Sequence, residues 1–380
     1  MAINKKGVFE TLAHKISNID SNSSTSDIID TLKAVKKADH NTIVSYDSDG
    51  ALPTASASNY RLAYVTNVGQ LRFNNGLQWD KLQTQLPSKA AAYSFQGTLY
   101  GYTHGGAPET NVIEKFPFAV DENSADVGDL TQNVARSSGS SGSTHGYRAG
   151  GSTPSITNRI DKYSFTVDGN ATDVGDLTGN RYYNTGQSSE NYGYSSGGDN
   201  SPSDTYKDYI EKYSHTTDGN ATDVGNLTLG RRLSAGQSSS THGYTSSGYN
   251  GSNSNIIDKF SFSVDGNATD VGDLTRTHRG SSGQSSSTHG YTSGGIPSPT
   301  GSNVIDKFPF SADANATDVG DMIQARRYVS GNSSTTHGYV TGGGSPYSNI
   351  IDKFPFASDA NATDVGNLTA ARDFLAGTQV

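Results

Sequence analysis

Residues 336–368 read THGYVTGGGSPYSNIIDKFPFASDANATDVGNL, and this stretch contains three short strings that recur along the chain. The string Asp-Val-Gly-(Asp/Asn)-(Leu/Met) begins six times, at Asp126, Asp173, Asp223, Asp270, Asp318 and Asp364. The successive intervals are 47, 50, 47, 48 and 46 residues. Self-similarity at a period of roughly 20–50 residues indicates a repeat architecture.

The other two strings keep the same phase as the first. Ile-(Asp/Glu)-Lys-(Phe/Tyr) begins at Ile113, Ile160, Ile210, Ile257, Ile305 and Ile351. Gly-Tyr precedes a pair of mostly small residues, and its tyrosines are Tyr102, Tyr147, Tyr194, Tyr244, Tyr291 and Tyr339. Three markers that repeat six times in one phase exclude a chance pattern.

Each unit predicts four short strands, which we expect in the sixth unit at 327–332, 337–341, 349–356 and 363–368. Aromatic and β-branched residues occupy these runs, and Gly, Asn, Asp and Ser separate them. Four strands in about 47 residues, repeated six times, are typical of a β-propeller. The sequence therefore predicts an all-β fold with a six-bladed propeller over residues 89–380. A stacked solenoid or trimeric β-fibre is the rival architecture.

Ring closure has two possible forms, because the first-strand pattern occurs seven times. We expect Phe374 to Thr378 to close the ring by completing the first blade, with residues 92–96 displaced or forming an extra edge strand. Seven blades, one of them partial, is the alternative.

The composition excludes several classes of partner. The 380 residues are only 32% hydrophobic, and 28 Lys and Arg face 37 Asp and Glu, for a net charge of −9. Such a chain has no evident attraction for a nucleic-acid backbone. It has no Cys, and no apolar run is long enough for membrane insertion. We also expect no signal peptide at the N-terminus.

Residues 1–88 lie outside the repeat. Val8, Leu12 and Ile16 have helical spacing, so we expect residues 1–42 to form a helical anchor segment. Short amphipathic helices do not bury an apolar stripe alone, so this stripe packs on the propeller, on itself or on a second chain. Residues 43–88 predict a small β-meander with strands at 62–66, 70–73 and 78–82.

The repeat resembles the kelch motif, in which an apolar strand ends in a glycine pair and an arginine precedes the next blade. The matching pairs begin at Gly105, Gly150, Gly197, Gly294 and Gly342, and Ser247 departs from the pattern. The matching strand aromatics are Phe116, Tyr163, Tyr213, Phe260, Phe308 and Phe354. The arginine matches at Arg181, Arg231, Arg326 and Arg372, with Arg279 one position later and Arg136 two positions later. The kelch tryptophan is missing from every unit. The resemblance supports the propeller architecture more strongly than membership of the kelch family.

The chain lacks the sequence signatures of the enzyme classes that have a propeller fold. Kelch-like copper oxidases use a Cys–Tyr crosslink, and this chain has no Cys; sialidase-type propellers repeat a Trp-containing signature, and the chain has one Trp. No phosphate-binding glycine loop or nucleophile elbow occurs. The expectation is a protein that is not an enzyme and has no cofactor.

The segments Leu52 to Ala55 and Asn75 to Trp79 resemble a short module in structural proteins of marine bacteriophages. This resemblance implies a virion protein located at the particle surface. It also implies that other virion proteins bind the N-terminal segment and that the chain is a homo-oligomer on the particle.

Three repeated polar patterns each allow a structural and a functional interpretation. His145, His242, His289 and His337 either support the strand or form a metal ring. The Asp-Gly-Asn-Ala-Thr-Asp turns beginning at Asp168, Asp218 and Asp265 are either tight turns or calcium loops. The third-strand lysines, which are Lys115, Lys162, Lys212, Lys259, Lys307 and Lys353, either form ion pairs between blades or snorkel.

The connections between the second and third strands vary between units, and binding residues concentrate on variable loops over a fixed scaffold. By strand order these loops share a face with the connections between blades. Tyr206, Tyr249 and Tyr347 are the candidates for stacking on sugar rings, with Asn200 as a hydrogen-bonding partner. The functional hypothesis is attachment to a host-surface glycan or protein receptor. The alternatives are a decoration or fibre-linking protein and, from another class, a glycan hydrolase with two carboxylates about 5–10 Å apart.

Overall fold

The computed structural model describes residues 94–200, 206–297, 301–344 and 346–380, together with Leu52 and the strands of residues 44–81. The chain divides into two compact units, Met1–Ala92 and Tyr93–Val380. Every regular element in the described part is a β-strand. No helix there is long and apolar enough to cross a membrane. The helices expected within residues 1–42 lie outside the described residues.

The first unit contains a four-stranded sheet with the order β1-β2-β3-β4. Its strands are β1 (Val44–Tyr46), β2 (Leu62–Val65), β3 (Gln70–Asn74) and β4 (Trp79–Lys81). The antiparallel β2-β3-β4 part confirms the predicted meander within a residue or two at each strand end. The sequence analysis missed β1, which pairs in parallel with β2.

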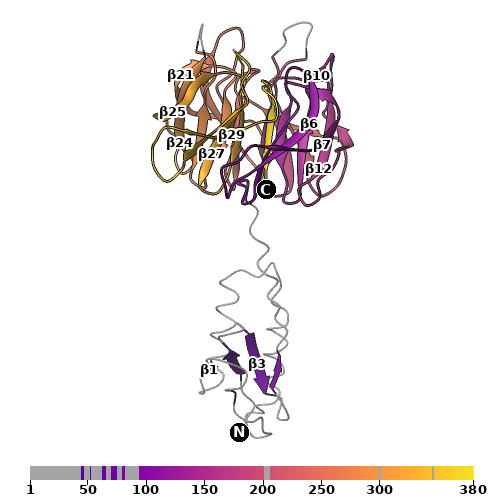
Figure 1. The fold of residues 1–380 in the computed structure, drawn as a ribbon, viewed down its shortest axis with the longest axis vertical. Helices are drawn as coiled ribbons and strands as arrows, with labels where there is room; N and C mark the ends of the chain where they lie inside the picture. The colour runs from indigo at the N-terminus through magenta and orange to yellow at the C-terminus, as the bar shows by residue number, and fades with distance from the viewer. Residues whose placement is uncertain are drawn as a thin grey trace. The chain divides into compact units, whose positions relative to one another are not determined.

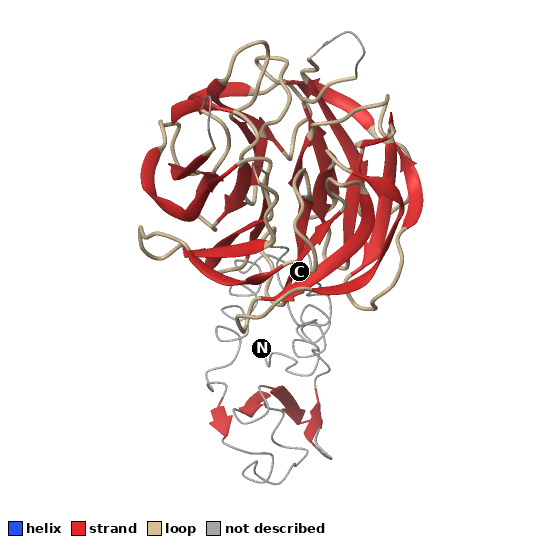
Figure 2. Cartoon of the chain, turned by 45° about the horizontal axis from the view of Figure 1, so that its top comes forward, coloured by secondary structure: helices blue, strands red, loops and turns tan. Residues whose placement is uncertain are grey.

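The second unit is a six-bladed β-propeller, and each blade is a four-stranded sheet (Figures 1 and 2). From the channel outward we name the strands a, b, c and d, and blade 1 has the order β30-β5-β6-β7. The a strands are β8 (Ser138–Ser141), β14 (Thr185–Ser188), β18 (Ala235–Ser238), β22 (Ser282–Ser285), β26 (Ser330–Ser333) and β30 (Ala376–Gln379). The b strands are β5 (Tyr100–His104), β9 (His145–Ala149), β15 (Tyr192–Ser196), β19 (His242–Ser246), β23 (His289–Ser293) and β27 (His337–Thr341).

The two outer strands of each blade carry the other sequence markers. The c strands are β6 (Thr110–Pro117), β12 (Arg159–Ser164), β16 (Tyr209–Ser214), β20 (Ser254–Ser261), β24 (Ser302–Pro309) and β28 (Ile350–Pro355). The d strands are β7 (Ala125–Val134), β13 (Thr172–Asp176), β17 (Thr222–Asn226), β21 (Thr269–His278), β25 (Thr317–Arg326) and β29 (Thr363–Asn367). A short hairpin, β10 (Ser152–Thr153) with β11 (Ser155–Ile156), extends the b–c loop of blade 2.

The last strand closes the ring. β30 pairs antiparallel with β5, so the C-terminal strand completes blade 1 and the predicted closure is confirmed. Residues 94–97 do not form a further strand. Their one bridge joins Gly97 to Ser334, and the Gln96 side chain donates a 2.9 Å hydrogen bond to the Ser334 carbonyl. This part of the displaced first-strand pattern therefore lies at the channel, beside the end of β26.

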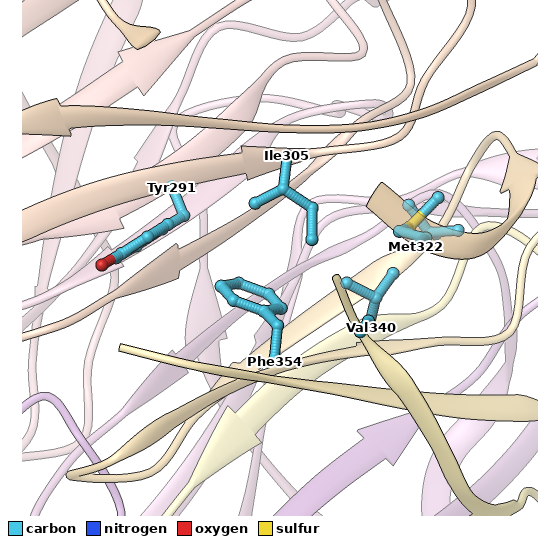
Figure 3. Packing of buried hydrophobic residues seen from close by; sticks show 7 residues of the cluster. Tyr291, Ile305, Met322, Val340 and Phe354 are labelled. Atoms are coloured by element: carbon cyan, nitrogen blue, oxygen red, sulfur yellow. The ribbon is translucent and has the colours of Figure 1, made fainter. Parts of the chain in front are cut away.

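The apolar core consists of six clusters, one between each pair of neighbouring blades. Figure 3 shows the cluster between blades 5 and 6, where Tyr291, Ile305 and Met322 of blade 5 face Val340 and Phe354 of blade 6. The Tyr291 and Phe354 ring centroids are 5.4 Å apart. Because each cluster is small, a chain with few apolar residues is enough to build the ring.

Close approach of the a strands requires glycine at their second position. A Cβ atom built on Gly236 would lie 2.2 Å from the carbonyl oxygen of Gly186 in the preceding blade. The same contact recurs around the whole channel, at Gly139, Gly186, Gly236, Gly283, Gly331 and Gly377. These glycines therefore set the spacing of the six blades.

Ion pairs between blades confirm one interpretation of the third-strand lysines. Lys353 of blade 6 binds Asp121 of blade 1 at 2.5 Å, and the equivalent Lys–Asp pair joins each of the other blades to its successor. The carboxylate belongs to the c–d turn of the next blade, not to the acid next to the lysine in sequence.

A second set of ion pairs is buried. Arg231 follows strand d of blade 3 and binds Asp258 of blade 4 at 2.8 Å, with both side chains fully buried. Arg181, Arg326 and Arg372 form the same contact at three other boundaries. The expected matches at Arg136 and Arg279 are wrong, because Val134 and His278 occupy the equivalent positions. In blade 2, Arg148 from strand b binds the corresponding Asp161.

Candidate functional site

The b–c loops and the d–a connections lie on one face of the propeller, as strand order predicts. Isolated bridges join the two kinds of segment in each blade, for example Arg232 with Tyr249 and Arg327 with Gly344. In Figure 1 this face is at the upper end of the propeller, near β10, and the C-terminus is at the opposite end. The loops that vary in sequence therefore surround one opening of the central channel.

A ring of strained backbone surrounds that opening. Six residues, one from each d–a connection, have φ angles between 54° and 68°. We call them the mouth ring: Arg136, Tyr183, Leu233, Gly280, Tyr328 and Phe374. The N–H group of each donates to the carbonyl of its counterpart in the preceding blade, at 2.6 to 3.0 Å. A left-handed conformation costs non-glycine residues about 1–3 kcal/mol each, and such strain clusters at functional sites.

Side chains of the mouth ring and its surroundings form a belt of alternating guanidinium groups and aromatic rings. Its members are Arg136, Tyr183, Tyr206, Arg232, Tyr249, Arg279, Arg327, Tyr328 and Phe374. Each guanidinium carbon lies 4.5 to 5.7 Å from the centroid of at least one ring. The contacts run from blade to blade around the mouth, and we call this set the arginine–aromatic belt.

The belt contains one stacked pair of rings and two arginines that each contact more than one ring. Tyr328 and Phe374 stack with their centroids 4.0 Å apart. Arg136 lies over both Tyr183 and Phe374, and its Nε donates a 3.0 Å hydrogen bond to the Tyr183 hydroxyl. Arg232 lies over Tyr183 and also over the loop tyrosines, which joins the channel mouth to the loops.

The predicted ligand-binding residues fall into two groups. Tyr206 and Tyr249 belong to the belt, with ring centroids 5.9 Å apart and planes at 88°. Tyr347 lies on the b–c loop of blade 6 and is 52% exposed. Asn200 is exposed on the same loop as Tyr206, next to Asp199. The structure therefore brings two of the four residues together, and their role in binding stays a prediction.

Two carboxyl groups lie among the arginines at the boundary between blades 6 and 1. Asp373 is 6% exposed, and burial raises its pKa to about 6 although Arg136 and Arg327 oppose this shift. Glu109 binds Arg136 at 3.3 Å, and its negative charge also raises the pKa of Asp373. Asp373 and Glu109 are the carboxyl groups at the mouth that the hydrolase hypothesis would use as its pair.

The channel behind the mouth is narrow and polar. It encloses a cavity of about 150 Å³, lined mainly by glycine and serine of the a strands. Ser137, Ser234 and Ser330 contribute to its lining, and their buried hydroxyls have no hydrogen-bond partner in the described protein. Phe95 lines the other end, where its carbonyl accepts a 2.6 Å hydrogen bond from Gln379. The propeller chain therefore begins at the end opposite the belt.

The candidate calcium turns have structural contacts in every blade. The Asp218 carboxylate binds Lys162, and the Asn220 side-chain oxygen accepts a 3.0 Å hydrogen bond from the Asp176 N–H. Equivalent contacts recur at all six c–d turns. These contacts favour the tight-turn interpretation, because the side chains that a cation needs already join neighbouring blades.

The histidines of the candidate metal ring are on separate blades. In each of the four, Nδ1 lies 2.8 or 2.9 Å from the hydroxyl of the preceding threonine. Partial burial and then Lys162 lower the pKa of His145, and the other three histidines show the same direction and causes. Among the described residues, no three His, Asp or Glu side chains are grouped as metal ligands would be.

No protein-family model matches the chain, and no curated protein matches it significantly. The belt must therefore be interpreted from its own chemistry. Sequence reasoning named Arg136 and Arg279 only as kelch matches and missed the mouth-ring aromatics, because the mouth-ring positions hold different residues. An arginine precedes three of these positions, at Arg232, Arg279 and Arg327. The sequence signal for the belt was variation between units. The two residues that come after the position of the buried arginine, such as Tyr182-Tyr183 and Arg327-Tyr328, form a different pair in every unit of an otherwise regular repeat.

Proposed function

We propose that the chain is a non-enzymatic structural protein of a bacteriophage virion whose kelch-like propeller attaches the particle to the host surface. The observation that carries this proposal is the arginine–aromatic belt among variable loops on one face. The resemblance of the segments around Leu52 and Trp79 to a module of phage structural proteins supports the location on the particle.

The belt has the chemistry of a recognition surface. Tyrosine and arginine are enriched where proteins bind their partners, because both combine a flat contact area with hydrogen-bonding groups. All six mouth-ring residues share the left-handed conformation, which is free of strain only for Gly280. Tyr183, Tyr328 and Phe374 keep large side chains there at a cost that glycine would avoid. Strain retained at one opening favours a role in binding.

The entry point of the chain supports an orientation for this role. Residues 94–97 lie at the end of the channel opposite the belt. In the proposal, residues 1–88 bind other virion proteins, and several copies of the chain on one particle give avidity to weak individual contacts.

The test is binding of the purified full chain to cells of the bacterium that the particles infect. We expect saturable binding that Tyr249→Ala reduces at least tenfold and that Lys353→Gln leaves within twofold, since Lys353 lies at the c–d turns. Equal binding by the wild type and Tyr249→Ala would contradict attachment through the belt. Absence of the chain from purified particles, checked by antibody labelling in electron micrographs, would contradict the virion role.

Two other functions give different results in related experiments. If the propeller only links neighbouring subunits, exchanging the b–c loops will change particle stability and leave host range unaltered. The hydrolase is favoured by one observation, the raised pKa of Asp373 beside Glu109. It predicts release of reducing ends from host polysaccharide by the wild-type chain and loss of this activity in Asp373→Asn.

A further inference from the structure

Basic side chains fall into two groups, those that form an ion pair with a carboxylate and those that do not. Among the described residues of the propeller unit, every Lys and Arg except three has a carboxylate oxygen within 4.0 Å. The exceptions are Lys207, Arg279 and Arg327. In a chain with a net charge of −9, an unpaired cation is unusual, and these three deserve a common explanation.

All three exceptions lie on the face that carries the belt. Arg279 and Arg327 hold the same position in consecutive d–a connections, where each bridges to a b–c loop. Lys207 follows Tyr206 in the b–c loop of blade 3. Among the described residues of the propeller, unpaired positive charge is therefore confined to the mouth of the channel.

Each unpaired arginine contacts an aromatic ring and has no carboxylate oxygen within 4.0 Å. Arg279 lies 4.5 Å from the centroid of Tyr249, and its guanidinium donates a 2.9 Å hydrogen bond to the Asn253 side-chain oxygen. Arg327 lies 5.3 Å from the centroid of Tyr328. Contact with a ring orients a guanidinium and leaves most of its N–H groups available to an anion.

We propose that the arginine–aromatic belt binds an anionic saccharide, a sugar chain whose rings carry carboxylate, sulfate or phosphate groups. The planar guanidinium fork matches such oxyanions in a bidentate geometry. The hydroxyl groups of the neighbouring Tyr249 and Tyr328 can exchange hydrogen bonds with sugar hydroxyls. This inference rests on the proposed attachment function and specifies the chemistry of its ligand.

The charge pattern of the whole molecule supports an anion at this face. The opposite end carries the six c–d turns, each with at least one carboxylate and followed by an aspartate at the start of strand d, and the lysines that pair with the turns are already used. A polyanion is repelled there and attracted only at the mouth, so the charges would also orient the approach of the ligand.

The experiment compares binding of the full chain to immobilised polygalacturonate, dextran sulfate, a phosphorylated dextran and neutral dextran. We expect binding to at least one anionic polymer, weakening as salt is raised, and at least tenfold weaker binding to neutral dextran. The polymer that binds most tightly identifies which anionic group is recognised. The double variant Arg279→Gln/Arg327→Gln should bind that polymer at least tenfold more weakly, as loss of charge-assisted hydrogen bonds implies.

The matched control is Arg276→Gln on β21, the outermost strand of its blade. Arg276 approaches Asp318 only to 3.9 Å, so its replacement also removes an exposed arginine charge without touching the belt. Its binding should stay within twofold of the wild type. Circular dichroism melting curves that coincide for all variants show that each one is folded.

Four results would overturn the inference. Equal affinity for neutral and anionic dextrans would show that charge is not recognised. Unchanged binding by the double variant would show that the belt is not the site. Binding to host cells without binding to any of the polymers would leave the attachment function in place and reject the anionic saccharide. Failure to bind both cells and polymers would reject the two proposals together.

Discussion

At the c–d turns the same lysine, aspartate and asparagine make the same contacts in all six blades, whereas the six mouth-ring positions hold five different residue types. The turns use side chains to join neighbouring blades. The mouth uses backbone hydrogen bonds, which run from each N–H to the carbonyl of the preceding blade whatever the side chain is.

This difference separates stability from recognition within one repeat. Where the side chains of the c–d turns join two blades, every unit keeps them, because each boundary has the same contact. Where the backbone alone joins them, as at Leu233 and Gly280, the side chain is free to vary. We therefore expect substitutions to cost most in the buried boundaries between blades and least at the mouth.

The largest expected effect follows from breaking a buried ion pair. Asp258 binds Arg231 and accepts a 2.6 Å hydrogen bond from the Thr228 hydroxyl, and Asp258 and Arg231 are fully buried. Asp258→Asn leaves the arginine charge without a partner, so the free energy of unfolding should fall by about 3–5 kcal/mol. Urea denaturation measures this loss. Asp258→Glu is the control, because Glu211 forms the same pair in blade 3. A loss below about 1 kcal/mol for Asp258→Asn would contradict the role of the pair.

The second effect depends on pH and arises from His104. This side chain is fully buried, both its ring nitrogens lack a hydrogen-bond partner, and burial together with Arg148 and Arg372 lowers its pKa to about 3. Because the unfolded state takes up a proton below about pH 6.5 and the folded state does so only near pH 3, stability falls as the pH drops between these values. The expected loss from His104 is about 2 kcal/mol at pH 5.

His104→Ser removes this contribution, since serine occupies the equivalent position in three other blades, at Ser196, Ser246 and Ser293. The slope of unfolding free energy against pH between pH 7 and pH 5 should become shallower in the variant. His215 and His278 keep part of the slope, because burial lowers the pKa of each to about 4. An identical slope in the wild type and the variant would show that His104 does not stay neutral in the folded state.

A smaller effect tests the rule that governs the boundaries between blades. The third residue of strand a meets the c-strand aromatic of the next blade, and two combinations occur. Ser140 lies 2.7 Å from the Tyr213 hydroxyl, whereas Gln187, which faces the blade of Phe260, donates a 3.0 Å hydrogen bond to the Tyr244 carbonyl. A tyrosine is thus paired with a short hydroxyl residue and a phenylalanine with an amide.

Tyr213→Phe should cost about 1 kcal/mol, because it removes one hydrogen bond. Ser140→Gln should cost about 1–3 kcal/mol by crowding the Tyr213 hydroxyl. The double variant recreates the other natural combination, so its cost should be at least about 1 kcal/mol below the sum of the two. Thermal and urea denaturation of the four proteins give the coupling energy. If the cost of the double variant equals the sum of the two single costs, the residue at position 140 and the aromatic at position 213 are independent of each other.

Much of this architecture was predictable because the repeat markers are the residues that join the blades. Ile351 and Phe354 are buried in the core, and Lys353 pairs across the boundary, so one short string encodes three contacts. The kelch comparison assigned Arg136 and Arg279 wrongly. The other arginines follow the Asp-Val-Gly aspartate by eight positions, and the same count leads to Val134 and His278.

The belt was not predictable in the same way. Its contacts join residues such as Arg232 and Tyr183, which lie on different blade boundaries and follow no repeated string. Residues that every blade needs for packing recur at the repeat period. Residues of a surface that the whole ring forms need not recur, so the period does not identify them. Only Tyr206 and Tyr249 were found, because the length and variability of the b–c loops pointed to them.

The smallest expected effects compare the two faces directly. Lys353→Gln breaks one exposed ion pair of the turns and should lower the free energy of unfolding by less than about 1 kcal/mol. The loss should vanish in about 1 M salt, where charges are screened beyond roughly 3 Å. Arg327→Gln at the mouth should change stability by no more than about 0.5 kcal/mol, because Arg327 has no carboxylate oxygen within 4.0 Å among the described residues and acts on Asp373 only from farther away. Urea denaturation at low and high salt measures both. A salt-dependent loss in Arg327→Gln would mean that the mouth also holds the blades together by charge. The separation of stability from recognition would then fail.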